Sequence, residues 1–321
     1  MKNTENLIVS INVIAPIFFM LSLGYLIKTI HIIDQKTVDV MNKVTFKVLL
    51  PILLFNSIYK TQIVGAFRPK LIITAIVSVV AVFVFLCIVI PLIEKENKKR
   101  GVLIQAIFRS NFVIFGLPIS IALCGEQNVG PTAILIAIVV PIYKALSVVA
   151  LEIFKDKTKN VKKSAIILRI LKGIATNPLI IAAALGVIAM LLKIQFPSAI
   201  DKSISSISSI GTPLSLILLG ATFSFGDTKG YKKQLSIGIL GKLIFVPLIC
   251  IPIFIALGFR DVELVALTVM IAAPTAVSTY TIAHQMNADA KLAGQLVVYD
   301  SIFSILTMFL WVFCLKNLGL F

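Results

Sequence analysis

Long apolar runs, separated by short polar loops, follow one another along almost the whole chain. A run of about 20 apolar residues is long enough for an α-helix to cross the roughly 30 Å hydrocarbon core of a bilayer. We therefore predict an all-α polytopic membrane protein with ten transmembrane helices. The predicted spans are residues 7–28, 37–59, 71–93, 102–124, 131–154, 177–194, 204–225, 235–258, 263–285 and 292–316.

Two polar, proline-containing stretches interrupt this pattern, at residues 109–118 in the fourth span and 273–284 in the ninth. Every backbone N–H and C=O group in hydrocarbon needs a partner, so a broken helix is tolerated only where protein or a watery cavity surrounds it. The two stretches occupy corresponding places in the two halves of the chain. Such a matched pair predicts one central cavity and is typical of the binding site of a secondary transporter.

The spans divide into two groups of five, which predicts the internal organisation. We expect residues 1–154 to form a first five-helix repeat, residues 155–176 a basic cytoplasmic connection, and residues 177–321 a second repeat. An odd number of spans in each half places the halves in opposite orientations across the membrane. Residues 1–321 are therefore expected to form a single membrane domain of two inverted repeats.

Positive charge is concentrated in alternate loops. The chain has a formal net charge of +16 at pH 7, yet 59% of its residues are hydrophobic. Seventeen basic residues fall in one set of loops and eight in the other set. Because basic loops stay on the cytoplasmic side, this asymmetry predicts that both termini lie outside. The charge therefore indicates membrane topology, and no nucleic-acid partner is expected.

Residues 161–176, within the basic connection, carry basic side chains on one helical side and isoleucine and leucine on another. This pattern predicts an interfacial helix that lies on the cytoplasmic leaflet, in contact with membrane lipids. The alternative is that the segment lengthens the start of the sixth span. The Asn177-Pro178 pair is typical of a helix boundary and favours the interfacial helix.

Residues that carry covalent or metal chemistry are few and scattered. The chain has four cysteines, each in an apolar span, and two widely separated histidines. It contains no HExxH, P-loop or GxSxG pattern. A membrane-embedded enzyme would need converging carboxylates, whereas Asp300 is essentially the one acidic residue well inside a span. We therefore expect no enzymatic activity, no metal site and no cofactor.

Several short motifs, in order along the chain, carry a family resemblance. They are FRSNFVIFGLP at 108–118 in the fourth span, VPIY at 140–143 and LSV at 146–148 in the fifth, NPL at 177–179 in the sixth, PL at 213–214 in the seventh and AAPTAVSTY at 272–280 in the ninth. Through these motifs the chain resembles bacterial members of the auxin efflux carrier family. The resemblance covers essentially the whole chain.

The resemblance implies a fold similar to that of sodium/proton antiporters and bile acid symporters. Spans 1, 2, 6 and 7 would form a scaffold, and spans 3–5 and 8–10 a mobile, elevator-type transport unit in which broken spans 4 and 9 cross. The implied function is transport of small organic anions, such as malate, malonate or auxin-like acids, across a bacterial inner membrane by alternating access. The implied assembly is a homodimer.

The candidate binding residues lie in the two broken spans. A carboxylate gains from the free N–H groups and partial positive charge at two half-helix starts. Asn111 is the first candidate, because its side-chain amide can donate to such a carboxylate. The alternative is that Asn111 satisfies backbone groups opposite Pro274. The remaining candidates are two predicted helix-breaking prolines and three hydroxyl residues, whose alternative role is a bond to their own helix: Pro118, Pro274, Thr275, Ser278 and Thr279.

Three charged residues inside predicted spans complete the candidate site. Arg109 either attracts the anion or locks a gate; the alternative is that its side chain extends to the cytoplasmic interface. Lys144 and Asp300 lie in counterpart spans, where the family pattern has Asn and a small hydroxyl residue, and an unpaired buried charge is costly. We therefore predict a Lys144–Asp300 ion pair that braces the transport unit. Proton coupling at Asp300 is the alternative.

Two other functions stay open at this point. One is a sodium-coupled or proton-coupled carrier of the same fold with a different substrate. The fifth span has no Asp-Asp pair and carries Lys144 instead, which weighs against this function. The other is a membrane sensor that does not transport.

Overall fold

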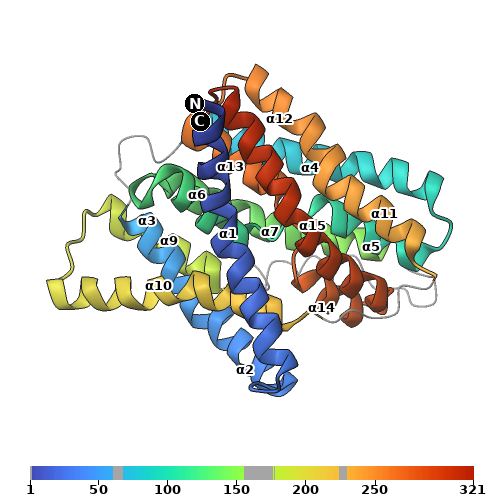
Figure 1. The fold of residues 1–321 in the computed structure, drawn as a ribbon, viewed down its shortest axis with the longest axis horizontal. Helices are drawn as coiled ribbons and strands as arrows, with labels where there is room; N and C mark the ends of the chain where they lie inside the picture. The colour runs from blue at the N-terminus through green and yellow to red at the C-terminus, as the bar shows by residue number, and fades with distance from the viewer. Residues whose placement is uncertain (1, 61–67, 155–175, 177, 224–229) are drawn as a thin grey trace.

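The computed structural model describes residues 2–60, 68–154, 176, 178–223 and 230–321. Within these ranges the regular secondary structure is helical, apart from one β-bridge between Ser110 and Thr275. The all-α class predicted from the hydrophobic pattern is confirmed (Figure 1). The predicted interfacial helix at residues 161–176 lies outside the described residues, except for Thr176.

Among the described residues, six helices are long and apolar enough to cross a membrane. Large apolar side chains remain exposed along them, for example Ile73, Val77 and Val84. Exposed faces of this kind suit contact with lipid, so the chain is a multi-pass membrane protein. The six are α1 (Lys2–Thr29) from Ser10 onward, α4 (Pro69–Ile93), α7 (Gly130–Ile153), α10 (Ser198–Ala221), the continuous run Lys232–Ala256, and α15 (Ala290–Asn317).

Shorter helices make up the other apolar segments. The predicted fourth and ninth spans are each divided into two helices, as their polar stretches indicated. Two π-helical turns, η1 and η3, lie inside the second and eighth predicted spans. The shorter elements are α2 (Gln35–Val44), η1 (Thr45–Leu49), α3 (Leu50–Tyr59), α5 (Asn97–Phe108), α6 (Phe112–Cys124), η2 (Glu126–Asn128), α9 (Pro178–Leu191), α11 (Lys232–Leu240), η3 (Gly241–Phe245), α12 (Val246–Ala256), α13 (Asp261–Ala272) and α14 (Ser278–Gln285).

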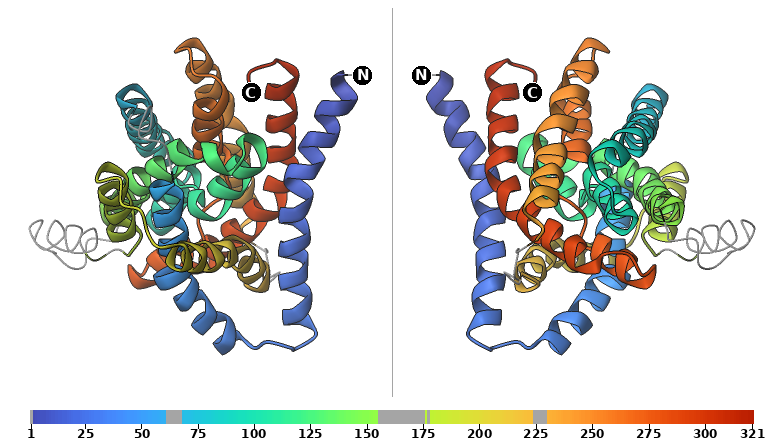
Figure 2. Two further views of the ribbon diagram at one scale, coloured as in Figure 1. Left: turned by 90° about the vertical axis from the view of Figure 1, so that its left-hand side faces the viewer. Right: turned by 90° about the vertical axis from the view of Figure 1, so that its right-hand side faces the viewer.

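The helices pack as two groups. One group contains α1, α3, α9 and α10, and the other contains α4, α5, α6, α7, α11, α12, α13, α14 and α15. α15 lies beside α1, and α7 contacts α3 and α9, so both groups share one apolar core (Figures 1 and 2). The start of α1 and the end of α15 lie at the same end of the molecule (Figure 2). The broken helices are in the second group.

A close crossing of α1 and α10 depends on one glycine from each helix. A Cβ atom on Gly24 would lie 1.8 Å from the carbonyl oxygen of Ile217, and one on Gly220 would lie 1.9 Å from that of Leu21. No side chain fits at either position, so the two backbones are in direct contact. Small residues at such crossings are the usual means by which membrane helices gain packing energy.

Alanine at Gly24 or Gly220 is expected to push α1 and α10 apart and to lower the free energy of unfolding. Overpacking typically costs about 1–3 kcal/mol, and a clash with backbone is at the upper end of that range. Thermal unfolding of detergent-purified variants measures the effect. Gly211→Ala on α10 is the control, because its Cβ would lie 3.3 Å from the nearest atom. Equal melting temperatures for all three variants would contradict the expectation.

A side chain from α15 compensates for the proline that follows η3. Pro247 lacks the N–H group that would otherwise bond to the carbonyl of Leu243, four residues earlier. The indole Nε1 of Trp311 donates to that carbonyl at 3.1 Å. The carbonyl is therefore satisfied, and α15 is joined to the run that contains η3. π-helical turns of this kind are frequent at functional sites.

We expect Trp311→Phe to lower the free energy of unfolding by about 1–3 kcal/mol, because the Leu243 carbonyl loses its donor. Pro247→Ala supplies a backbone N–H to the same carbonyl. The cost of Trp311→Phe is therefore expected to be smaller in the Pro247→Ala background, and a double-mutant cycle of thermal unfolding checks this. Identical costs in the two backgrounds would show that the hydrogen bond is not the reason.

Candidate functional site

Two segments that connect the halves of the broken helices, residues 109–111 and 273–277, lie side by side. We call this place the crossing. Ser110 and Thr275 form an antiparallel β-bridge across it. The backbone N–H of Asn111 donates to the carbonyl of Pro274 at 2.7 Å. The two polar stretches singled out in the sequence are thus brought together, although they are separated by more than 150 residues.

The two breaks have different local causes. Pro274 disfavours helical backbone at the residue before it, and Ala273 is extended, with φ −61° and ψ 148°. Arg109 is also extended, with φ −95° and ψ 119°, but no proline is adjacent. Pro118 lies inside α6 and does not break the helix. The prediction that Pro118 is a helix breaker is therefore wrong: the first break depends on pairing with the second.

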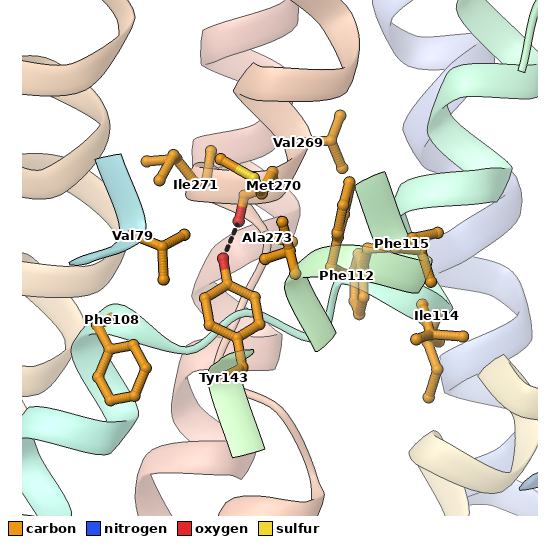
Figure 3. Close-up of a cluster of buried hydrophobic side chains, with 14 of the residues drawn as sticks. Val79, Phe108, Phe112, Ile114, Phe115, Tyr143, Val269, Met270, Ile271 and Ala273 are labelled. Carbon is orange, nitrogen blue, oxygen red and sulfur yellow. Dashed lines mark hydrogen bonds between the residues drawn. The ribbon is translucent and has the colours of Figure 1, made fainter. Parts of the chain in front are cut away.

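Side chains from other helices bond to the carbonyls at the end of α13. The Tyr143 hydroxyl, from α7, donates to the Met270 carbonyl at 3.0 Å (Figure 3). The Lys242 ammonium, from η3, donates to the Ile271 carbonyl at 3.0 Å. A helix C-terminus carries partial negative charge, so a lysine is a favourable partner there. Phe108 and Phe112 lie in the same buried cluster as Tyr143 (Figure 3).

Lys242 is a functional candidate that the sequence reasoning missed. Its side chain is completely buried and also donates to the Ser110 hydroxyl at the crossing. The available signal was a lysine in the middle of a long apolar run, which marks a functional residue by default. Lys242 therefore joins the end of α13 to the segment that follows α5.

Asp300, on α15, contacts the other half of the same β-bridge. Its carboxyl group is completely buried and its Oδ2 atom is hydrogen-bonded to the Thr275 hydroxyl. The same hydroxyl lies 2.7 Å from the carbonyl of Ala106, near the end of α5. Thr275 thus contacts α5 and α15, whereas the alternative foresaw a bond to its own helix. Asp300 interacts electrostatically with the positively charged side chain of Lys242.

The predicted Lys144–Asp300 ion pair is not present between these two described residues. Lys144 is exposed, whereas Asp300 is fully buried and bonded to Thr275. The Tyr143 side chain points into the protein from α7. Lys144, the next residue, is rotated by about 100° around the helix axis, because a turn has 3.6 residues. The side chain of Lys144 therefore points in a different direction from that of Tyr143, and the charge that interacts with it electrostatically is that of Arg109.

Arg109 is buried at the crossing, with 3% of its surface exposed. One terminal nitrogen, Nη2, donates to the hydroxyl of Ser278 at the start of α14. The other, Nη1, has no hydrogen-bond partner among the described residues. The guanidinium is therefore held inside the protein, without extending to the membrane surface.

Asn111 combines a satisfied backbone with an unsatisfied side chain. Its backbone N–H, and not its side-chain amide, donates to the Pro274 carbonyl. Its side-chain Nδ2 is buried and, within the described ranges, has no partner. Asn111 is 6% exposed in total. The side-chain amide therefore remains free to donate to a ligand.

The two half-helix starts add further donors. Neither α6, which begins after Asn111, nor α14 has a side-chain hydrogen bond at its N-cap. The first N–H groups of such helices are donors and carry partial positive charge. Thr279, in the first turn of α14, accepts from the Gln105 amide at 3.3 Å through its carbonyl, while its own hydroxyl has no partner in the described part of the chain.

The crossing presents two chemically different groups of side chains. Ser110 is bonded to Lys242 and Thr275 to Asp300, so these two residues contact the buried ionisable groups. Arg109 is extended, and successive side chains of extended backbone point to opposite sides, so the Arg109 side chain points away from Lys242. Arg109 and Asn111 carry donors that have no partner among the described residues. This second group has the chemistry of an anion site.

A comparison with protein families fits this arrangement of paired broken helices inside a multi-pass membrane protein. A family model described as "Membrane transport protein" matches residues 9–312. The chain belongs to this family of membrane transport proteins, and its resemblance to the auxin efflux carriers is confirmed. The family is one of transporters and not of enzymes.

Curated relatives match over almost their full lengths. The chain is 23% identical over 304 residues to a Rhizobium meliloti protein named "Putative malonate transporter", with 92% of each chain covered. It is 21% identical over 324 residues to an uncharacterized transporter of Methanocaldococcus jannaschii, with 96% of this chain and 100% of the relative covered. It is also 21% identical over 315 residues to an uncharacterized transporter of Methanothermobacter thermautotrophicus, with 94% and 97% covered.

Lys242→Met is expected to destabilise the folded protein strongly. The substitution removes the donor to the buried Ser110 hydroxyl and to the Ile271 carbonyl. A buried polar group that is left without a partner typically costs about 1–3 kcal/mol. Thermal unfolding measures the loss, with Lys47→Met, at an exposed lysine, as the matched control. A Lys242→Met protein as stable as the control would contradict this assignment.

Proposed function

We propose that this protein is a secondary transporter of small organic anions, which bind at the crossing. The observation that carries the proposal is a pair of buried donors without partners, Nη1 of Arg109 and Nδ2 of Asn111. Burying a donor without a partner costs free energy, and more when the group is charged. A carboxylate that accepts from both side chains removes this cost.

The helix starts strengthen the preference for a negative ligand. Arg109 lies at the start of α14, where its charge opposes the partial positive charge of the helix terminus. An anion between the guanidinium and the two uncapped helix starts converts this repulsion into attraction. The planar guanidinium is suited to a carboxylate in particular, because it donates two parallel hydrogen bonds. The proposed substrate class is therefore mono- and dicarboxylates.

Malonate is the first member of this class to test. The name of the Rhizobium meliloti relative supports this choice, and the chain covers 92% of that relative at 23% identity. Malate and auxin-like aromatic acids, which the family resemblance implies, follow. All three present a carboxylate to the same donors, so their relative binding is set by residues around Arg109 and Asn111.

We further propose that the ten predicted spans form two inverted five-helix repeats, residues 1–154 and 177–321, in one domain. The close packing of α1, α3, α9 and α10 supports a scaffold made of spans 1, 2, 6 and 7. The broken helices would then move with the remaining spans as an elevator, which alternately exposes the crossing to each side. A homodimer joined through the scaffold, and an inner-membrane orientation with both termini outside, complete this proposal.

The test is malonate flux into proteoliposomes containing the purified protein. Arg109→Gln and Asn111→Ala are each expected to weaken malonate binding by about ten- to one-hundred-fold, since a hydrogen bond to a charged group contributes about 1.5–3 kcal/mol. Asn128→Ala is the matched control, because Asn128 is exposed in η2. Ligand-induced thermal stabilisation gives an independent binding measurement.

Other outcomes separate the competing functions. Malonate flux that is unchanged in both variants would reject the crossing as the anion site. Flux that requires a sodium gradient would favour the sodium-coupled carrier. Malonate-induced stabilisation without flux would favour the membrane sensor.

A further inference from the structure

The Thr275 hydroxyl has one proton and two close oxygen neighbours. It lies 2.7 Å from the carbonyl oxygen of Ala106 and is also hydrogen-bonded to Oδ2 of Asp300. A hydroxyl donates one hydrogen bond and accepts through its lone pairs. It therefore cannot donate to both oxygens, and one of the two contacts needs a proton from elsewhere.

The carbonyl of Ala106 is unable to supply that proton, because a carbonyl only accepts. The helix α5 ends at Phe108, so the Ala106 carbonyl has no N–H partner within the helix. In the described part of the chain, its donor is the Thr275 hydroxyl. A carboxyl group, in contrast, becomes a donor when it is protonated. With a proton on Oδ2, Asp300 donates to Thr275, and Thr275 donates to Ala106.

The ionised alternative leaves two buried oxygens without donors. If Asp300 is a carboxylate, Thr275 must donate to it, and the Ala106 carbonyl then faces an oxygen that has no proton to offer. Oδ1 of Asp300 has no hydrogen-bond partner among the residues described. A fully buried carboxylate with one donor is expensive in a membrane, whereas the neutral acid is not. The hydrogen-bond geometry thus fits the protonated acid.

We propose that Asp300 is a proton-binding site of this protein and that the Thr275 hydroxyl links its protonation to the crossing. Uptake joins one proton from water to the carboxylate, as an O–H group on Oδ2, and release returns that proton to water. On release the Thr275 hydroxyl turns to the carboxylate, and the Ala106 carbonyl loses its donor. The bond between α5 and the segment before α14 is then broken.

Lys242, from η3, is the charged group that acts on Asp300. It is held by the Ser110 hydroxyl and the Ile271 carbonyl, and it makes no ion-pair contact with Asp300. The neighbour from the segment before α14 is the neutral Thr275. Other ionisable side chains on α15 and on the elements packed against it are exposed or have contacts elsewhere: Lys28, Lys99, Arg100, Arg109, Lys232, Lys233, His284, Asp289 and Lys291. Lys316 lies in the last turn of α15, more than four helical turns from Asp300.

The same geometry couples the proton to the anion, and this step rests on the proposed function. Ser110 and Thr275 form the β-bridge of the crossing, and each is bonded to one of the two buried charges. The donors of the proposed anion site, on Arg109 and Asn111, flank Ser110 in the same segment. Neutralising Asp300 removes a negative charge that repels the anion, so each ligand favours binding of the other to the same extent. Proton and anion therefore move together.

Infrared difference spectroscopy of reconstituted protein tests the proton site without any substrate. The wild-type protein is expected to show the carbonyl band of a buried protonated carboxylic acid, which disappears as the pH is raised. Asp300→Asn removes that band, and Glu126→Gln, at an exposed carboxylate in η2, leaves it unchanged. Identical spectra for wild type and Asp300→Asn at every pH would overturn the proposal.

Variants at Thr275 test the link and remain useful if Asp300→Asn fails to fold. Thr275→Ser keeps the hydroxyl and is expected to leave the carboxylic-acid band near its wild-type frequency. Thr275→Val removes the acceptor of the Asp300 proton and is expected to shift the band to the frequency of a free acid. An identical band in both variants would show that Thr275 is not the partner of that proton.

Malonate-driven acidification of the lumen, followed with an entrapped pH-sensitive dye in proteoliposomes, tests the coupling. Wild-type protein is expected to carry protons inward with malonate, and Asp300→Asn to carry malonate without protons. Equal proton movement in the two proteins would overturn the coupling. An absence of malonate flux in both, with the pH-dependent carboxylic-acid band intact, would count against the proposed function and support the proton site alone.

Discussion

Every backbone N–H and C=O group inside a membrane needs a hydrogen-bond partner, and the arrangement around the two helix breaks follows from this constraint. The last carbonyls of a helix lack N–H partners from their own chain segment. At the crossing, Tyr143, Lys242 and Thr275 each lie close enough to one of these carbonyls to donate to it, and each comes from a different element than the helix concerned. Several polar side chains in the interior thus have a backbone role, and Nη1 of Arg109 and Nδ2 of Asn111 are among the buried donors that have no partner in the described residues.

Much of the fold is predictable from the sequence, because the thickness of hydrocarbon sets the length of a helix and polar interruptions need a local reason. The positions of both breaks were predicted in this way. The exact ends were not: the first break lies at residues 109–111, between α5 and α6, and Pro118 is inside α6. A proline is tolerated within a membrane helix, whereas the pairing of Ser110 with Thr275 joins residues far apart and leaves no local signal.

The charged residues show where sequence reasoning about the site stops. Lys144 and Asp300 have complementary charges in counterpart spans, but charge alone does not determine which way a side chain points. Tyr143 lies inward, and Lys144, one residue later, is exposed. Lys242 carried the same sequence signal as Lys144, a lysine well inside an apolar run, and its burial beside the crossing became evident only when η3, α13 and α15 were seen together. The sequence therefore identifies the charged residues inside the spans, but it does not identify their partners.

The glycine contact between α1 and α10 has a consequence for where movement can occur. Where helices touch through side chains, small rotamer changes let one slide along the other. Gly24 and Gly220 instead place backbone against backbone, with no side chain between them to rearrange. For α1 to slide along α10, the two backbones would first have to separate. We therefore expect α1 and α10 to keep their relative position. Sliding between helices is therefore easier at contacts lined by flexible apolar side chains than at the contact made by Gly24 and Gly220.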